Sequence, residues 1–307
     1  MRPRLVLLML LVAALGAVVL AVPATRTGLS QLGKRTRATV TGTPVADSVG
    51  LRLAAQAAPP PPTLHSAPVS INTSTAFFGW ALLDRGSGTI TGSANDETGH
   101  NTTESMIKAW IVSDYLRTHP NTGTTTLNEL KLAILDSNDD VAQKYYQIDG
   151  GNVVVQRLIS MCGLRHTTIK TGWWSMTQMT PADAVRYGLC VASGKAAGTK
   201  WTSWVLQTMH NVRGTVNDQP ADQKTGGGRW GIIDGLPTSL AAQVSIKNGW
   251  TFIFADNLWH VNCLAILPSS VLVVMMRYAA PDSVTGLKVG AGICASVTRQ
   301  LVYTPDL

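Results

Sequence analysis

The sequence has 307 residues, of which 45% are hydrophobic and 14% are charged, a composition typical of a folded globular protein. The net charge of +7 comes from the beginning of the chain: residues 1–58 hold seven Arg and Lys against the single Asp47, and the remainder has 18 against 17. A nucleic-acid-binding protein carries a basic patch on its folded domain. The charge distribution therefore argues against a nucleic-acid partner.

The chain begins with a pattern typical of export. Two arginines precede an uncharged apolar run over residues 5–22. This run is long for a cleaved signal and just long enough to span a bilayer, so residues 1–24 are either a signal peptide or a retained anchor. Residues 25–68 are rich in Ala, Thr and Pro without a sustained period, which predicts a linker. We therefore expect a secreted, extracytoplasmic protein, tethered to the membrane if residues 5–22 are retained.

The remainder, 69–307, is expected to fold as one domain. Its predicted elements, in chain order, are a hairpin of strands over 76–83 and 89–92, helices over 105–117, 127–135, 141–146 and 153–161, a helical zone from Thr180-Pro181 to about Asn211, strands over 243–246, 259–267 and 271–278, and a last helix over 292–302. The economical α/β arrangement joins the two terminal halves into one antiparallel sheet and inserts a helical lobe of about 105–212.

Four cysteines lie in the exported part, where oxidation is expected. Cys162 and Cys190 fall on neighbouring helical segments, whereas Cys263 lies in a strand-like run shortly before the helix that holds Cys294. Of the three pairings that four cysteines allow, we expect the local pairs 162–190 and 263–294; buried free thiols are the alternative. No Cys/His spacing resembles a zinc site, so neither a metal nor a cofactor is expected.

Ser105 and Lys108 form a Ser-x-x-Lys element at the start of a helix, which places both side chains on one face. A lysine so placed can take the serine's proton if burial or a nearby cation keeps it neutral. Taken alone, the pair is equally a helix-capping serine and a solvated lysine. Two further motifs strengthen the catalytic interpretation of this pair. They are Ser137-Asn138-Asp139 at the end of the next helix, and Lys247-Asn248-Gly249 at the close of a β-rich run.

These three elements, in this order, resemble the penicillin-recognising serine enzymes, namely the class A β-lactamases and the related DD-peptidases. The resemblance covers about 76–302, nearly the whole folded part. It implies a β-lactamase-like fold in which the N- and C-terminal segments form an antiparallel sheet, flanked by helices, with an inserted all-helical lobe.

The resemblance also implies a role for each motif residue. Ser105 would attack a carbonyl carbon with Lys108 as its base, and Ser137 would relay a proton toward the leaving nitrogen. Lys247 would hold the substrate carboxylate and lower the pKa of Lys108. The backbone N–H groups of Ser105 and Trp250 would form the oxyanion hole.

The sequence departs from this family at two motif positions. Asp139 stands where the family has Asn, and a carboxylate beside Lys108 would favour the charged ammonium. Asn248 replaces Thr or Ser but can still donate a hydrogen bond. Gly249 would let a substrate lie against the strand edge, although a glycine in a strand-end turn is an equally good interpretation.

The largest departure concerns deacylation. Class A β-lactamases activate the hydrolytic water with a loop glutamate, but the corresponding stretch, 165–179, contains no carboxylate. Asp149 is the nearest alternative, and we expect it to cap the following helix. Trp173 and Trp174 lie in this loop, where they either pack or wall a cleft. Without a placed base the acyl-enzyme should persist.

The sequence thus predicts an exported, monomeric serine hydrolase that is acylated by β-lactams or peptidoglycan peptides and deacylates slowly. A DD-peptidase-type cell-wall enzyme is one alternative. The other is a non-catalytic module that binds muropeptides or β-lactams in the same cleft, with Asp139 and the missing glutamate as signs of lost turnover.

Overall fold

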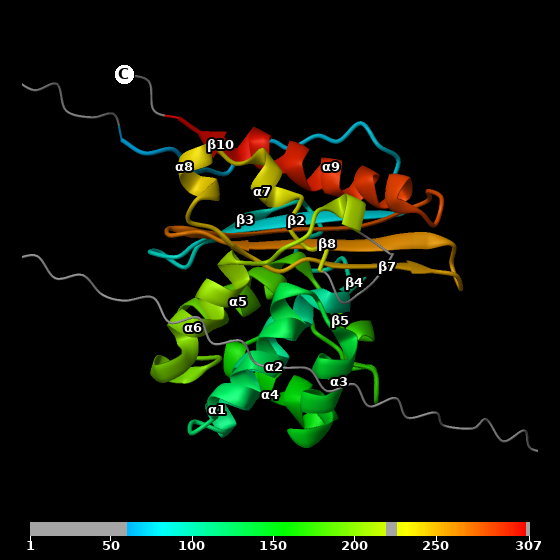
Figure 1. Cartoon of the computed structure of the whole chain (residues 1–307). Helices are drawn as coiled ribbons and strands as arrows, with labels where there is room; N and C mark the ends of the chain where they lie inside the picture. Colours follow the sequence, from blue (N-terminus) through cyan, green and yellow to red (C-terminus); the bar gives the residue numbers. More distant parts are fainter. Residues whose placement is uncertain (1–59, 219–225, 305–307) are drawn as a thin grey trace, which may run out of the picture. The chain divides into compact units, whose positions relative to one another are not determined.

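The computed structural model describes residues 60–218 and 226–304, so the expected leader (1–24) and most of the expected linker lie outside the described residues. Within them, the centre is an antiparallel sheet with strand order β3-β2-β9-β8-β6, in which β7 also pairs with β8 (Figure 1). Its strands are β2 (Phe77–Asp84), β3 (Ile90–Gly92), β6 (Ser245–Ile246), β7 (Gly249–Ile253), β8 (Leu258–Ile266) and β9 (Ser270–Tyr278).

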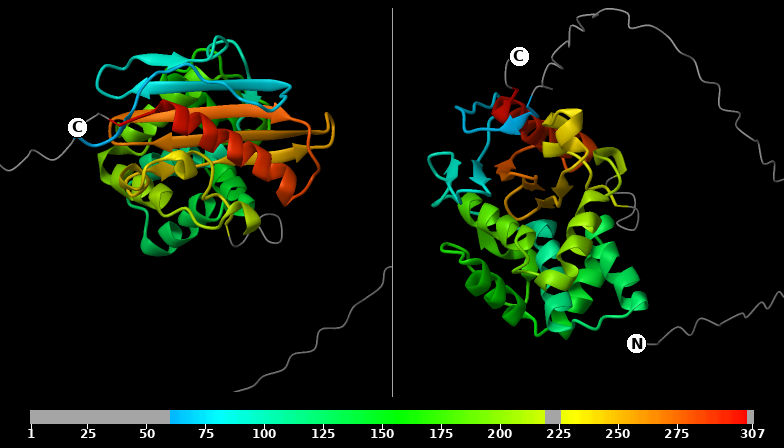
Figure 2. Two further views of the ribbon diagram at one scale, coloured as in Figure 1. Left: turned by 90° about the horizontal axis from the view of Figure 1, so that it is seen from above. Right: turned by 90° about the vertical axis from the view of Figure 1, so that its left-hand side faces the viewer.

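Helices cover both faces of this sheet. The long helix α9 and the short helices α7 and α8 lie on one face, and the lobe of α1 to α6 lies on the other (Figures 1 and 2). The helices are α1 (Lys108–Thr118), α2 (Thr124–Leu135), α3 (Asp139–Ile148), α4 (Asn152–Cys162), α5 (Pro181–Ala192), α6 (Gly198–His210), α7 (Ile232–Gly235), α8 (Thr238–Ala241) and α9 (Val284–Leu301). Short 3-10 turns are η1 (Glu104–Ile107), η2 (Trp174–Met176) and η3 (Val216–Asp218).

The two central strands explain the layering. Strands β8 and β9 are buried along almost their whole length because helices cover both faces, and their sequences are correspondingly apolar throughout. Helix α5 lies directly against the sheet at Gly188, where a Cβ atom would come within 2.5 Å of Val271 Cγ1. The glycine therefore allows the helical lobe to pack closely on the sheet.

The expected joining of the chain's two halves is confirmed. Strand β2, from the N-terminal half, pairs along its length with β9, from the C-terminal half, for example at Leu82 and Leu272. The domain begins earlier than residue 69, because β1 (Thr63–Leu64) pairs with β10 (Val302–Tyr303) after the last helix. The last residues of the expected linker are thus part of the fold.

Two elements differ from the sequence-based expectation. Strand β7 is an additional strand that begins at Gly249, so the Lys247-Asn248-Gly249 motif lies between β6 and β7 rather than at the close of a β-rich run. Helix α9 begins at Val284 rather than at 292, in spite of its glycines. A Cβ at Gly290 would lie 2.6 Å from Tyr278 Oη, so close packing on the sheet outweighs the low helix propensity of glycine here.

Both expected disulfides are present: Cys162–Cys190 joins α4 to α5, and Cys263–Cys294 joins β8 to α9. Among residues 60–218 and 226–304, no helix combines the length and apolar character needed to cross a membrane. Within the same residues, no group of three or more His, Cys, Asp or Glu side chains is arranged to hold a metal ion.

Candidate active site

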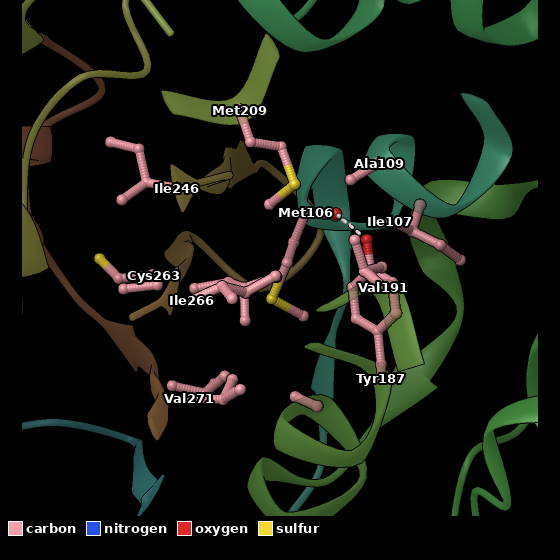
Figure 3. Close-up of a cluster of buried hydrophobic side chains, with 14 of the residues drawn as sticks. Met106, Ile107, Ala109, Tyr187, Val191, Met209, Ile246, Cys263, Ile266 and Val271 are labelled. Atoms are coloured by element: carbon pink, nitrogen blue, oxygen red, sulfur yellow. Dashed lines mark hydrogen bonds between the residues drawn. The ribbon is translucent and has the colours of Figure 1, made fainter. Parts of the chain in front are cut away.

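Ser105 lies in the 3-10 turn η1, which is fixed from below by the hydrophobic core. The next two side chains, Met106 and Ile107, are fully buried in the core that α5 helps to form (Figure 3). Tyr187 Oη on α5 donates a hydrogen bond to the Met106 carbonyl oxygen at 3.0 Å. Ser105 itself is partly exposed. The turn therefore holds the serine rigidly at the surface of the core.

Gly249 allows strand β7 to approach this turn. A Cβ at Gly249 would lie 2.6 Å from both Met106 N and Thr103 O, and 2.9 Å from Ser105 N. Any larger residue would push the strand away from the nucleophile turn. The glycine is thus required by the backbone of η1, whatever its part in admitting substrate.

The second motif lies at the junction of α2 and α3 rather than at the end of a helix. Asn138 caps α3, with its Oδ1 accepting a hydrogen bond from Val141 N at 2.9 Å. Ser137 has a left-handed backbone conformation, with φ of 56°. Asp139 is the first residue of α3. The sharp turn therefore places the side chains of Ser137 and Asp139 beside Lys108.

Two lysine side chains converge on the Ser137 hydroxyl. Lys108 Nζ donates to Ser137 Oγ at 3.2 Å, to the Ser137 carbonyl oxygen, and to Asp139 Oδ1 at 2.5 Å. Lys247 Nζ donates to the same Ser137 Oγ at 2.9 Å and to Asn248 O at 3.1 Å. The two lysines, 139 residues apart in the chain, are thus joined through one hydroxyl group.

Both lysine side chains are buried, but their charges are supported differently. Burial lowers the pKa of Lys108, and the carboxylate of Asp139 opposes this effect. Burial lowers the pKa of Lys247 well below its usual value, and the charge of Lys108 adds to the effect. Repulsion between two ammonium groups acts on both of them, so the two amines are not both charged without a cost.

A pocket of about 460 Å³ opens over this cluster. Its lining combines three serines, five acidic side chains and three indoles with other groups. The lining residues are Glu104, Ser105, Asp136, Ser137, Asp139, Asp140, Gln143, Trp173, Trp174, Ser175, Asp218, Gly226, Trp250 and Thr251. The nucleophile candidate and the proton-relay candidate thus face one hollow, and both lysine amines lie behind it.

Of the two residues on either side of Gly249, Trp250 lines the pocket and Asn248 does not. Asn248 Nδ2 donates to Gly228 O at 3.0 Å and to Trp230 O at 2.8 Å, so both of its N–H donors tie the strand to the following loop. Asn248 can thus donate hydrogen bonds as expected, and here it donates them to backbone carbonyl oxygens. Trp250 lines the pocket and makes an edge contact with the Trp230 ring at 5.4 Å.

The loop 165–179 contributes indoles rather than a base. Trp174 is buried, its ring centroid lies 5.4 Å from Lys108 Nζ, and its Nε1 donates to Gln143 Oε1 at 2.8 Å. Trp173 lines the same pocket with 57% of its surface exposed. The indole of Trp174 thus packs over the Lys108 ammonium.

Asp149 is not placed to activate water in this pocket. Its carboxylate pairs with Arg157 at 2.9 Å and accepts a hydrogen bond from Thr118 Oγ1 at 2.9 Å. It caps the C-terminus of α3 rather than the N-terminus of α4, whose N-cap is Gly151. Asp149 is therefore part of the ion-pair cluster that ties α1, α3 and α4 together.

Two of the pocket residues that the sequence analysis did not find make contacts across the site. Glu104, directly before the nucleophile candidate, is 3% exposed and contacts Thr251 of β7. Gln143, one turn into α3, holds the Trp174 indole. The position of Gln143 four residues after Asp139 was a usable helical signal, whereas nothing in the sequence indicates that the side chain of Glu104 points to β7.

Comparison with solved structures identifies the fold. A TLA-1 extended-spectrum β-lactamase has a TM-score of 0.57 and 18% identity, over 75% of this chain and 94% of that one. An ancestral class A β-lactamase has a TM-score of 0.54 and 14% identity, over 73% and 92%. This chain has the β-lactamase-like fold. The expected fold class is therefore confirmed.

Sequence comparison identifies relatives of low identity. No protein-family model matches the chain. The protein LppW of Mycobacterium tuberculosis and of Mycobacterium bovis, described as a candidate lipoprotein, is 26% identical over 210 residues. The match covers 66% of this chain and 62% of the length of these relatives.

Proposed function

We propose that this chain is an exported serine hydrolase that forms an acyl-enzyme on Ser105 with β-lactams or peptidoglycan peptides and releases it slowly. One observation carries the proposal: the Ser137 hydroxyl is bonded to two buried lysine amines, Lys108 and Lys247, and lines the same pocket as Ser105. A solvated surface lysine, the alternative for Lys108, does not account for its complete burial.

Acylation would begin with attack of Ser105 Oγ on the carbonyl carbon of the substrate amide. The serine proton passes to the neutral amine of Lys108, whose Nζ is joined through the Ser137 hydroxyl to the amine of Lys247. As the C–N bond breaks, the same hydroxyl returns a proton to the leaving nitrogen. The N–H groups of Ser105 and Trp250 would hold the oxyanion that forms in between.

Deacylation requires a base that activates water, and the pocket offers a poor one. The loop 165–179 has no carboxylate, and Trp174 occupies the space over Lys108. Asp139 already accepts a hydrogen bond from Lys108. The acyl-enzyme should therefore be long-lived.

Export is proposed from the apolar run at 5–22 and is supported by the description of LppW as a candidate lipoprotein. The peptidoglycan substrate class follows from this location and from the fold shared with β-lactamases. We propose a monomer that acts on such peptides or on the β-lactams that mimic them.

The Lys108–Asp139 ion pair favours a second candidate. A carboxylate 2.5 Å from Nζ stabilises the ammonium form, which cannot accept a proton. In that case the pocket would bind a β-lactam or muropeptide without forming a covalent bond, and the chain would be a binding module.

Mass spectrometry after incubation with a fluorescent penicillin tests the proposal. The wild-type chain should gain the mass of one acyl group and keep it for minutes or longer, whereas Ser105→Ala should gain none. A chromogenic cephalosporin should be turned over very slowly. Absence of an adduct together with ligand-dependent stabilisation would favour the binding module, and rapid cephalosporin turnover would contradict the slow deacylation step.

A further inference from the structure

A chain of hydrogen bonds runs behind the nucleophile turn, apart from the lysine cluster. Asp256 Oδ2 lies 2.9 Å from His260 Nε2, and His260 Nδ1 lies 2.8 Å from Thr102 Oγ1. Thr102 Oγ1 lies 2.6 Å from Glu104 Oε1, and Glu104 Oε2 lies 2.8 Å from Thr251 Oγ1. The chain connects a partly exposed carboxylate, Asp256, to strand β7.

Counting hydrogens shows that this series of hydrogen bonds holds one proton more than its neutral groups supply. Its four contacts need one hydrogen each, but a neutral imidazole and two hydroxyl groups supply only three. The Thr251 hydroxyl also lies 2.6 Å from the Trp250 carbonyl oxygen, a fifth contact that needs a hydrogen. The fourth hydrogen must therefore reside either on the carboxyl group of Glu104 or on the second ring nitrogen of His260.

Burial places this proton on Glu104. With the proton on His260, a cation and a carboxylate would both be buried, since His260 is 4% and Glu104 is 3% exposed. With the proton on Glu104, both groups are neutral, which a low-dielectric interior favours. Burial accordingly raises the pKa of Glu104 and lowers that of His260.

The charged groups around these two residues are few. Among the described residues, Asp139 on α3 favours the neutral carboxyl of Glu104, and Lys108 on α1 opposes it. Asp256 favours the charged form of His260, and Arg277 on β9 opposes it. These effects are secondary to burial at both sites.

Glu104 lies where it can hold two parts of the site together. It directly precedes Ser105, and its partner Thr251 directly follows Trp250. The backbone of Glu104 is left-handed, with φ of 47°, a conformation that a glutamate adopts only when its surroundings impose it. The hydrogen bond to Thr251 joins β7 to η1, the same two elements that pack together at Gly249.

We propose that Glu104 is a positioning residue whose protonated carboxyl links Thr251 to the nucleophile turn and thereby fixes the two N–H groups of the oxyanion hole. The inference rests on the proposed function, since it concerns the acylation step at Ser105. Loss of the proton would place a negative charge next to the developing oxyanion and would leave the contact between Glu104 Oε1 and Thr102 Oγ1 without its hydrogen, which loosens the carboxyl group that holds Thr251. Acylation should therefore fall at high pH.

The test measures the acylation rate constant and the dissociation constant for a fluorescent penicillin on the full-length chain between pH 5 and 10. Glu104→Gln keeps a donor and an acceptor but cannot ionise. It should match the wild type at low pH within about threefold and lack the decline of the wild type at high pH. Glu104→Ala should lower the rate constant about tenfold or more, with little change in the dissociation constant.

Glu129→Gln is the matched control, because Glu129 pairs with Lys144 at the surface and is absent from the pocket lining. Its pH profile should equal that of the wild type. A second readout is independent of chemistry: the stability that Glu104 contributes is present below its ordinary pKa of 4.5 and is lost as pH rises through its raised folded value. The Gln variant should therefore gain stability relative to the wild type as pH rises.

The outcomes separate this inference from the proposed function. If the wild type is never acylated, the proposed function is wrong and the role of Glu104 falls with it. If the wild type is acylated but Glu104→Ala reacts equally fast, or if the wild type and Glu104→Gln share one pH profile, only the role of Glu104 is overturned. Should Glu104→Ala fail to fold, the comparison with Gln still decides.

Discussion

The two walls of the pocket carry different chemistry. The motif wall, formed by η1, the junction of α2 and α3, and β7, presents two serines backed by two buried lysines whose amines share the Ser137 hydroxyl. The loop wall, formed by residues 165–179, presents indoles, and the described pocket lining has no carboxylate from this loop. The difference indicates that groups for forming an acyl bond and groups for hydrolysing it can be retained independently. Substitutions in one wall at a time therefore test whether the two steps are independent.

The largest expected effect comes from removing the amine of Lys108. Lys108→Met keeps the approximate length of the side chain but leaves Asp139 without this donor and the Ser137 hydroxyl with Lys247 alone, so acylation by a fluorescent penicillin should slow by about 10² to 10⁴-fold. Lys144→Met is the control, because Lys144 is half exposed and pairs with Glu129 on the surface. Acylation of Lys108→Met at the wild-type rate would mean that Lys247 and Ser137 alone remove the proton.

The motif wall could be predicted from the sequence because its geometry is largely local. Ser105 and Lys108 share a helical face, and the fold class follows from apolar runs such as those of β8 and β9. The convergence with Lys247 could be predicted only through the resemblance, since no local pattern connects residues so far apart.

The contacts behind and across the pocket could not be predicted. Glu104 reaches Thr251, which lies 147 residues away, through a left-handed backbone that no residue pattern announces. The placement of Trp174 over Lys108 depends on how the loop folds back, and the sequence contains only two adjacent tryptophans. Both contacts are set by tertiary packing, so a reading of periodicity and motifs alone does not find them.

The second prediction gives the loop wall the carboxylate that it lacks. Trp174→Glu should accelerate deacylation about 10- to 100-fold, measured by loss of the acyl mass with time, because a base would then lie near the acyl bond. Acylation should slow, since the new charge favours the ammonium of Lys108. Thr171→Glu adds the same charge at an exposed position of the loop that is absent from the pocket lining, and should leave both rates unchanged. Equal lifetimes in all three proteins would show that this wall does not limit deacylation.

The smallest effect is expected where the motif wall departs from the family, at Asp139. Asp139→Asn removes the carboxylate that supports the charge of Lys108, so the pKa of Lys108 should fall further. Because acylation needs a neutral amine, its rate should reach half of its maximum at a lower pH and should rise about tenfold at neutral pH, the change that corresponds to about one pKa unit. Asp140→Asn removes a negative charge from the same pocket without removing a partner of Lys108, and should shift the profile much less. A pH profile unchanged by Asp139→Asn would contradict the assignment of Lys108 as the base. Lys247, the second amine bonded to the Ser137 hydroxyl, would then be the amine whose titration controls acylation.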